Sequence, residues 1–436
     1  MFSSQNAFIT EAPASQLAQR FTQVRAQTER LIEPLSAEDC QLQSMPDASP
    51  AKWHLAHISW FFETFVLERY EPGFQPFDGS FRVLFNSYYN GVGDKYPRPR
   101  RGLISRPSLQ EVLAYRRQVN ERVLEVISRA DEADRIELAQ LIKLGLHHEQ
   151  QHQELLLTDI QHALSFNPQR PAYAKRWPLT STAPQPQRWH RYDGGLVKHG
   201  FDADLDGDFA FDNETPRHPV YIAPFELASR LVTNGEMMEF MADRGYQRPE
   251  LWLSMGWDWV QAGDQRLPLY WQGEAGNYSH FTLQGLQLVD PNTPVCHLSY
   301  FEADALARCA GARLPTEFEW ELAARLLPIS KVRSGNFVET AAYHPLPQQQ
   351  AASEVPAQML GDVWEWTQSN YNAYPGYRPW EGVVGEYNGK FMCNQFVLRG
   401  GSCVTPQSHV RASYRNFFPP DAQWQFSGLR LARDVS

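Results

Sequence analysis

The sequence lacks the features of secreted, membrane-spanning and nucleic-acid-binding proteins. Its five cysteines are scattered over 436 residues without C-x-x-C spacing, which excludes a disulfide framework and a cysteine zinc site. No apolar run approaches the roughly 20 residues that cross a membrane, and the N-terminus has neither the basic nor the apolar region of a signal peptide. The net charge is −10 with both signs mixed, so no nucleic-acid surface is expected. We expect a soluble, cytoplasmic protein.

The chain is long enough for two or three domains with sizeable cores. It contains no repeat of 20–50 residues and no low-complexity tract, which excludes repeat architectures. Aromatic residues reach 13% and include 13 tryptophans. That richness suits deep pockets, and it equally suits a β-rich core.

A proline-free stretch over residues 138–167 predicts a long buried helix. His148 and His152 are four residues apart, so one helical turn places both on the same face. His147 lies about 100° round the helix and points elsewhere. Two stacked imidazoles can bind one transition metal. The alternative is a hydrogen-bonded polar pair in the core of a bundle.

Three helices are predicted before this one. Apolar residues recur at helical spacing from residue 15 to about 35, a second helix starts at Ser49-Pro50 and runs to about 65, and a third covers 108–128. Four helices within about 165 residues predict a four-helix bundle, a fold that builds metal sites from facing helices.

The second helix offers His54 and His57 as a third ligand. Both lie in an apolar, aromatic segment, where an unpartnered imidazole is costly. We favour His57, which lies mid-helix. Each ligand needs an acceptor for its other ring nitrogen, and Glu149 and Glu154 are the candidates.

A long loop over residues 85–102 separates the second and third helices, and loops of this length are usually functional. Its arginines beside prolines can receive a carboxylate, and the alternative is a solvated basic turn. Tyr88 and Tyr89 are either packing residues or redox-active phenols. After a proline-rich linker at 166–190, short β-like runs predict a second domain over 191–436.

The second domain carries motifs in a characteristic order: FDNETP (211–216), RLPTEFEW (313–320), GDVWEW (361–366), LRGGS (398–402) and GLRLARD (428–434). In this order they resemble the formylglycine-generating-enzyme-like fold, a C-type-lectin-related α+β domain. Formylglycine generators use a cysteine pair after the Gly-Gly-Ser turn. This chain has only Cys403 there, so that activity is not expected.

The first domain, residues 1–165, resembles the DinB-like three-histidine bundles through Leu55-Ala56-His57 and His148-Glu149-Gln150-Gln151-His152. The two domains in this order resemble the sulfoxide synthases of ergothioneine biosynthesis. The resemblance implies an enzyme that uses iron(II) and O2 to join the sulfur of cysteine or γ-glutamyl-cysteine to C2 of the hercynine imidazole. It also implies a two-domain α+β protein with its active site between the domains.

Residue by residue, the resemblance makes His57, His148 and His152 the iron ligands. Gln151 would hydrogen-bond the hercynine imidazole, and Asn416 would hold the hercynine end. A cage for the trimethylammonium group would come from aromatic side chains by cation–π attraction. Its candidates are Trp364, Trp366, Phe417 and Trp424.

Arg98 and Arg101 keep the spacing of an arginine pair that binds the carboxylate of the thiol. Tyr88 and Tyr89 resemble the tyrosine pair of the subgroup whose active-site phenol comes from the N-terminal loop. Actinobacterial relatives have Trp-Asp after the asparagine, where this chain has Phe417-Phe418, and this favours free cysteine as the donor.

Other reactions fit the same residues. A synthase of the selenium analogue, or of 5-histidylcysteine sulfoxide, would share nearly all of these motifs. A DinB-like thiol S-transferase would share the three histidines but normally lacks the second domain. A lectin-like binding protein would leave the histidines unexplained. The oligomeric state and the choice between the two tyrosines stay open.

Overall fold

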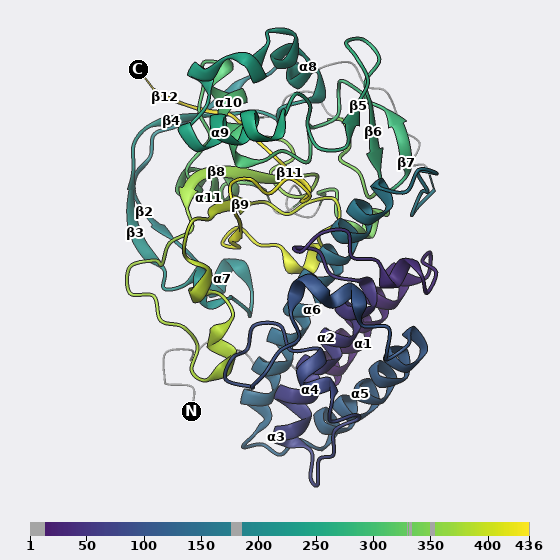
Figure 1. The fold of residues 1–436 in the computed structure, drawn as a ribbon. Helices are drawn as coiled ribbons and strands as arrows, with labels where there is room; N and C mark the ends of the chain where they lie inside the picture. The colour runs from purple at the N-terminus through teal and green to yellow at the C-terminus, as the bar shows by residue number, and fades with distance from the viewer. Residues whose placement is uncertain (1–13, 176–184, 329, 331–333, 349–353, 436) are drawn as a thin grey trace. The chain divides into compact units, whose positions relative to one another are not determined.

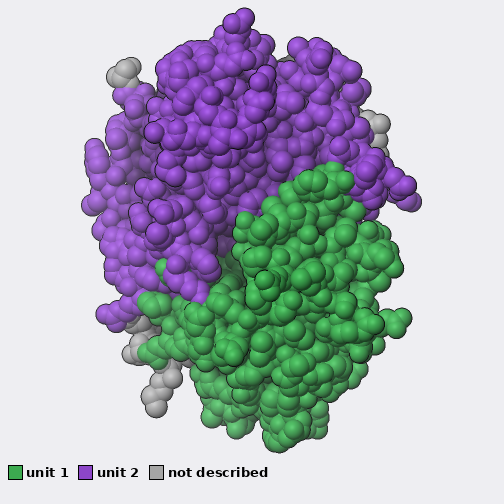
Figure 2. Space-filling view, viewed as in Figure 1, with its two compact units in different colours: residues 1–166, 203–211, 379–389 green, residues 167–202, 212–378, 390–436 purple. Residues whose placement is uncertain are grey.

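The computed structural model describes residues 14–175, 185–328, 330, 334–348 and 354–435 (Figure 1). These fall into two compact units (Figure 2). Unit 1 comprises residues 1–166, 203–211 and 379–389, and unit 2 comprises 167–202, 212–378 and 390–436. Two short segments from beyond residue 166, 203–211 and 379–389, therefore pack within the N-terminal unit, which a division at one boundary does not anticipate.

Unit 1 is helical. Its α-helices are α1 (Ala14–Ile32), α2 (Ala51–Phe62), α3 (Glu68–Tyr70), α4 (Phe81–Leu84), α5 (Leu109–Arg129), α6 (Arg135–Ser165) and α7 (Ala203–Asp206). The chain also forms η1 (Asp39–Gln41), η3 (Arg98–Leu103) and η8 (Val383–Glu386) as 3₁₀ turns, and η2 (Glu63–Leu67) as a π-helical turn. The four long helices α1, α2, α5 and α6 form the bundle (Figure 1).

The four predicted bundle helices are confirmed, and local chemistry explains their ends. Pro50 stands directly before α2, where its fixed φ and missing N–H suit a helix start. Ser108 and Glu111 form a reciprocal capping box at the start of α5. The second helix extends further than predicted, because it continues through the π-helical turn into α3. Part of the predicted loop 85–102 is also helical, as η3.

Helices α2 and α6 approach closely at Gly145. A Cβ atom added there would lie 2.6 Å from Cε1 of Phe62 and 3.0 Å from Cε1 of Phe61. Glycine therefore permits the contact between the two helices that carry the predicted metal ligands, at the cost of its poor helix propensity.

Unit 2 is the mixed α+β part. Its strands are β1 (Trp189–Tyr192), β2 (Gly195–His199), β3 (His218–Ile222), β4 (Phe225–Ala228), β5 (Trp271–Gln272), β6 (Ser279–Thr282), β7 (Gly285–Leu288), β8 (Trp364–Asn370), β9 (Phe396–Arg399), β10 (Asn416–Phe418), β11 (Ser427–Gly428) and β12 (Ala432–Asp434). Its helices are α8 (Asn234–Ala242), α9 (Ser254–Gly263), α10 (Tyr300–Cys309) and α11 (Glu317–Arg325), with short 3₁₀ turns between them. The first strand begins inside the predicted linker 166–190 and ends two residues beyond it. Residues 176–184 of that linker are outside the described residues.

The strands form four small sheets. Their orders are β1-β4-β12, β10-β9-β8-β11, β2-β3 and β5-β6-β7. In the four-stranded sheet β9 pairs antiparallel with both β8 and β10, and Asn416 lies opposite Leu398. The main core of unit 2 gathers around the fully buried Trp320 of α11.

All five cysteines are free thiols, as the sequence predicts. Among the described residues, no helix is long and apolar enough to cross a membrane.

Candidate metal site

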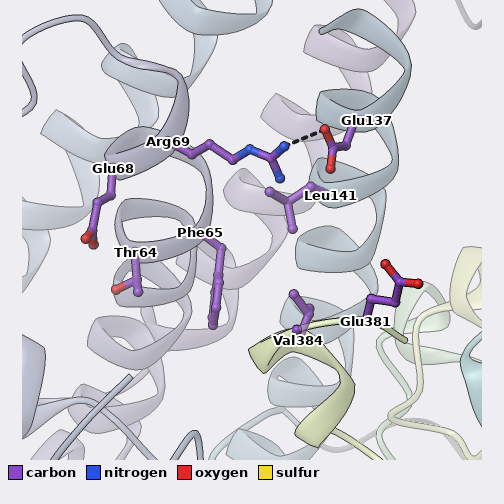
Figure 3. Close-up of a pocket in the computed structure, with 9 residues that line it drawn as sticks. Thr64, Phe65, Glu68, Arg69, Glu137, Leu141, Glu381 and Val384 are labelled. Carbon is purple, nitrogen blue, oxygen red and sulfur yellow. Dashed lines mark hydrogen bonds and ion pairs between the residues drawn. The ribbon is translucent and has the colours of Figure 1, made fainter. Parts of the chain in front are cut away.

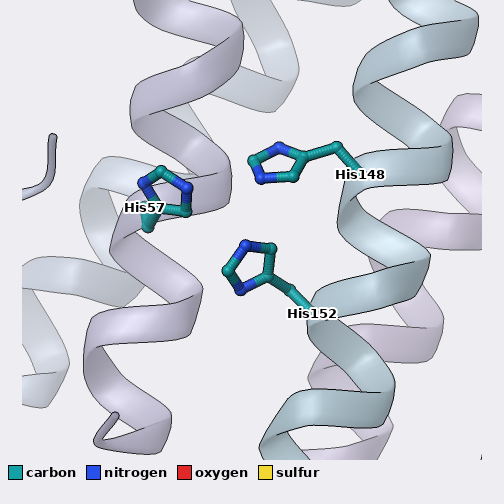
Figure 4. A group of neighbouring side chains, drawn as sticks. All are labelled: His57, His148 and His152. Atoms are coloured by element: carbon teal, nitrogen blue, oxygen red, sulfur yellow. The ribbon is translucent and has the colours of Figure 1, made fainter. Parts of the chain in front are cut away.

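Three histidines from two helices of unit 1 come together (Figure 4). His57 lies on α2, and His148 and His152 lie one turn apart on α6. Their possible ligand atoms are all within 4.8 Å of one another. Within the described ranges of the chain, no other group of three or more His, Cys, Asp or Glu side chains meets that criterion. The i, i+4 spacing and the choice of His57 over His54 therefore agree with the geometry of the cluster.

Burial keeps these three imidazoles neutral. It lowers the pKa of His148 to about 3 and the pKa values of His57 and His152 well below 6.5. Neutral imidazole is the form that binds metals. Nε2 of His57 and both ring nitrogens of His148 are buried without a hydrogen-bond partner, which is costly in a protein interior. The site therefore fits a transition-metal ion that prefers nitrogen ligands.

The outer ring nitrogens are held in different ways. Nδ1 of His57 donates to the carbonyl oxygen of Phe85 at 2.6 Å. Nδ1 of His152 lies 2.7 Å from Nδ1 of His54, and Nε2 of His54 lies 3.0 Å from Oδ2 of Asp159. His54 is thus a partner of a cluster histidine and stands outside the cluster.

Of the two candidate acceptors, the structure excludes Glu149. Its carboxylate faces the other side of α6, where it accepts hydrogen bonds from Arg25 at 3.0 Å, Arg116 at 2.6 Å and Thr28 at 2.6 Å. Burial alone would raise the pKa of Glu149, but the two guanidinium groups outweigh it and hold the pKa at about 2. Glu149 therefore ties α1, α5 and α6 together. The acceptors found for the rings are His54 and Phe85, so Glu154 fills that role for neither His57 nor His152.

An aromatic stack encloses His57. Its ring is stacked on Trp53 at 4.6 Å with an interplanar angle of 12° and on Trp60 at 5.5 Å and 17°. The Arg101 guanidinium covers the outer face of Trp53, 3.4 Å from the ring centroid. Residues at i−4 and i+3 of one helix lie on the same face, so the helix itself builds this sandwich.

The two predicted arginines have different surroundings. Arg98 is more than half exposed, and its guanidinium donates to the backbone of Asp47. Arg101 is 5% exposed, and it donates from Nη1 to Ser49 at 2.9 Å. Its Nε is buried without a hydrogen-bond partner. Burial, with Arg98 second, lowers the pKa of Arg101 to about 9.

Three phenols stand beside the histidines. The ring of Tyr88 is 4.9 Å from that of Tyr89 and 6.0 Å from that of Tyr387. Tyr387 is 5.5 Å from His148, and its hydroxyl donates to Oε1 of Gln151. Sequence reasoning missed Tyr387. It lies 236 residues from Gln151, and no motif around it signals a site.

Two side chains, Asn86 and Glu386, hold the segments that carry these tyrosines. Asn86 is fully buried; its Oδ1 accepts the Tyr89 N–H at 3.2 Å, and its Nδ2 donates to three loop carbonyls. The Glu386 carboxylate accepts the N–H groups of Asn90 at 3.0 Å and Gly91 at 2.8 Å. Within unit 1, the segment 379–389 is thus fastened to the tyrosine loop.

Comparison with known proteins assigns both parts of the chain. Residues 20–156 match the DinB superfamily, and residues 181–435 match the sulfatase-modifying factor enzyme 1-like domain. Hercynine oxygenase of Mycobacterium tuberculosis is 33% identical over 445 residues, covering 96% of this chain and 99% of the relative. The hercynine oxygenase of Mycolicibacterium smegmatis is 32% identical with the same coverage. The formylglycine-generating enzyme of Streptomyces coelicolor is 30% identical but covers only 56% of this chain.

This chain belongs to the hercynine oxygenase family. The predicted two-domain organisation, with a DinB-type bundle before a formylglycine-generating-enzyme-like domain, is confirmed by these matches. The similarity to hercynine oxygenase extends over both domains, so it does not rest on the second domain alone.

The remaining predicted residues of this family member lie in unit 2. Asn416 and Phe417 begin β10, and the ring of Phe417 stacks on Tyr371 at 3.9 Å and 12°. Trp364 and Trp366 are 1% and 0% exposed, and the indole N–H of Trp366 donates to the carbonyl of Leu298. These two tryptophans are core residues and cannot cage a ligand. Of the four cage candidates, Phe417 and Trp424 remain.

A separate pocket of about 530 Å³ opens in unit 1 beside the π-helical turn (Figure 3). Its lining residues are Thr64, Phe65, Glu68, Arg69, Glu137, Leu141, Glu381, Gly382 and Val384. The Arg69 guanidinium is paired with Glu137 across it. None of the three cluster histidines lines this pocket, so it is not the metal site of this hercynine oxygenase relative.

Proposed function

We propose that the protein is an iron(II)-dependent hercynine oxygenase. The reaction joins the sulfur of cysteine, or of a cysteine-containing peptide, to C2 of the hercynine imidazole. One O2 supplies the sulfoxide oxygen and accepts the thiol and C2 hydrogens as water, so four electrons balance. The observation that carries the proposal is similarity to hercynine oxygenases over 96% of the chain, together with three clustered, neutral imidazoles from the matched bundle.

His57, His148 and His152 would hold the iron. When bound there, iron(II) supplies O2 activation and lowers the pKa of a coordinated thiol. The protein's part is to hold sulfur next to the imidazole carbon and to exclude competing reactions.

Arg101 is the best candidate for binding the carboxylate of the thiol substrate. Its guanidinium is buried, and none of the described acidic groups lies within ion-pairing distance of it. A buried guanidinium with an unpartnered Nε suits a planar carboxylate, which takes two parallel hydrogen bonds from the same edge. Arg98 is largely exposed, so its contribution would be weaker.

The phenols would supply a proton. Burial raises the pKa of Tyr88, and hydrogen bonding with Tyr89 and Tyr387 offsets only part of the rise. The phenol is therefore protonated at neutral pH and can act as a donor. Tyr88, Gln151 and His152 are only half-buried, whereas Tyr89 is fully buried. Substrate therefore has access to Tyr88, and Gln151 would bind the hercynine imidazole on this open side. The role of Asn416 in holding hercynine stays a prediction from the resemblance.

The sulfur donor would be free cysteine. An acidic residue that could meet a γ-glutamyl amine is absent from Phe417-Phe418. An apolar pair would leave that charged end without a partner, and leaving such a group unpaired costs affinity.

A mass-spectrometric product assay tests the proposal. Iron(II)-loaded protein is given hercynine in air, with cysteine and γ-glutamyl-cysteine in competition. We expect hercynyl-cysteine sulfoxide as the main product. The γ-glutamyl product would overturn the donor assignment, and turnover of histidine or of a selenium donor instead would place the protein in a neighbouring branch. No oxygen-dependent product would favour the S-transferase alternative.

Iron loading of the His152→Ala variant tests the assignment of the metal ligands. We expect it to abolish iron loading and product formation. His162→Ala is the control, because His162 lies on the same helix outside the cluster, with Nδ1 2.7 Å from the Ser44 hydroxyl. Equal iron loading in both variants would contradict the ligand assignment.

A further inference from the structure

We propose that His54 and Asp159 form a hydrogen-bonded relay that positions His152 as a metal ligand and strengthens it as a donor. The inference deepens the proposed function and rests on it, because it takes the histidine cluster to be a metal site. Neither residue belongs to the cluster, so both would be positioning residues.

The relay is continuous, and its carboxylate end is buried. Oδ2 of Asp159 lies 3.0 Å from Nε2 of His54, and Nδ1 of His54 lies 2.7 Å from Nδ1 of His152. The same Asp159 oxygen accepts the backbone N–H of Ser49 at 2.8 Å. His54 is 2% exposed and Asp159 is 6% exposed, so water does not compete for the contact between them.

Hydrogen-bond chemistry fixes the direction of the relay. An ionised carboxylate only accepts, so Nε2 of His54 must carry the proton that it donates to Asp159. Nδ1 of His54 is then an acceptor, and Nδ1 of His152 donates to it. The one nitrogen of His152 left with a free lone pair is Nε2. The carboxylate thereby selects, through two rings, the tautomer of His152 that can bind a metal.

The same logic excludes His54 as a ligand. Both of its ring nitrogens are engaged, one by Asp159 and one by His152. Ligation by His54 would break one of these buried contacts.

The relay makes the three ligands unequal. His57 is held by a neutral carbonyl, and neither nitrogen of His148 has a hydrogen-bond partner. His152 alone is connected to a carboxylate among the contacts described for the three rings. A ring that donates toward negative charge is a stronger base at its other nitrogen. His152 is therefore the most strongly donating of the three.

Metal affinity measured without turnover tests the relay. Cobalt(II), which has a visible ligand-field spectrum, is titrated anaerobically into wild type, Asp159→Asn, His54→Phe and the double variant. We expect His54→Phe to weaken cobalt binding by roughly 10- to 100-fold, the usual effect of removing such a partner. Asp159→Asn keeps an oxygen acceptor but loses the charge, so its loss should be smaller. Both changes should shift the cobalt spectrum.

The double variant separates a relay from two independent defects. If the residues act in series, the double variant binds cobalt no more weakly than His54→Phe alone, because the connection is already broken. His162→Ala controls for loss of an imidazole elsewhere on α6. If His54→Phe does not fold, Asp159→Asn alone provides the test. The amide oxygen in the Asp159→Asn variant can still accept hydrogen bonds from Ser49 and His54.

The outcomes distinguish this inference from the proposed function. Wild-type protein that binds neither cobalt nor iron would overturn both. Wild type that binds metal, with folded variants that bind within twofold of it or whose losses add fully, would overturn only the relay.

Discussion

The stack of Arg101, Trp53 and His57 links two roles at the scale of single residues. The guanidinium that we propose for the substrate carboxylate covers the indole that stacks on His57, a proposed metal ligand. Arginine suits this place because its planar group both stacks on an aromatic face and pairs with a carboxylate. Lysine can do neither in the same geometry.

Arg101→Lys should therefore raise the KM for the thiol by at least tenfold with a smaller effect on the KM for hercynine. Arg98→Lys should change either constant by less than about threefold, because exposed ion pairs contribute roughly 0–1 kcal/mol. Steady-state kinetics with each substrate varied in turn make the comparison. A larger effect at Arg98 than at Arg101 would contradict the assignment.

Tyr88 lies between the two other phenols, so its hydroxyl should matter most. We expect Tyr88→Phe to lower the rate of C–S bond formation by roughly 10²-fold or more, the usual contribution of a positioned proton donor. Thiol consumption should continue as simple sulfur oxidation. Product ratios by mass spectrometry test this, with Tyr89→Phe, whose phenol is fully buried, as the milder comparison. A Tyr88→Phe enzyme with an unchanged product ratio would move the role to another group.

Local sequence patterns were enough to anticipate the histidine cluster, because each helix carries its own signal. His148 and His152 are recognisable because helical geometry fixes i and i+4 on one face, and His57 because it lies in an apolar helix. His54 could be seen only as a rival ligand, since its link to Asp159 spans 105 residues. Glu149 remained a candidate acceptor because adjacency in sequence says nothing about which arginines approach from α1 and α5.

At the scale of elements, the α2–α6 contact controls the site. Glycine in a helix interior usually lowers stability. Replacing it with alanine at an uncrowded position raises stability by roughly 0.5–1 kcal/mol. Here the new Cβ would strike the Phe62 ring at 2.6 Å and approach Phe61. Phe61 in turn packs on His148, with centroids 4.9 Å apart.

Gly145→Ala should destabilise unit 1 by about 1–3 kcal/mol, the usual cost of overpacking, and should also weaken metal binding. Gly79→Ala is the control, because a Cβ there meets nothing within 4 Å. Chemical denaturation of metal-free protein, followed by a metal titration, measures both effects. A stabilised Gly145→Ala variant would show that the helices can move apart freely.

Amphipathic spacing and proline positions predicted the four bundle helices, because those signals are local. The segment 379–389 gave no such signal. It carries Tyr387 and the Glu386 contacts, yet its packing within unit 1 depends on long-range contacts. In unit 2, the motifs identified the fold through resemblance, but composition alone did not tell core tryptophans from ligand-facing ones.

At the scale of the whole molecule, each unit is tied by its own buried charge network. In unit 1, Glu149 joins two arginines. In unit 2, Glu317 accepts from Arg415 at 2.9 Å and lies 3.6 Å from Arg399. Removing one member of such a network leaves a charge buried without compensation, which costs about 3–5 kcal/mol. Stability at this scale therefore depends on pH through carboxyl groups that lie outside the histidine cluster.

Glu317 gives the sign of that dependence. Burial alone would raise the pKa of Glu317, but Arg415 and Arg399 outweigh it and lower the pKa below 4.5. A carboxyl whose pKa is lowered by folding adds stability that is fully present above its unfolded-state pKa and is lost as the pH falls toward the folded-state value. Wild type should therefore lose this contribution only below about pH 4.5.

Glu317→Gln should be less stable than wild type by about 3–5 kcal/mol at pH 7, and the gap should narrow as the pH falls below 4.5. Urea unfolding midpoints of metal-free protein between pH 7 and about pH 3.5 measure that gap. Glu226→Gln is the control, since the Glu226–Arg433 pair lies at the surface and should contribute roughly 0–1 kcal/mol at any pH. A gap that stays constant across this range would mean that Glu317 acts through packing and not through its charge.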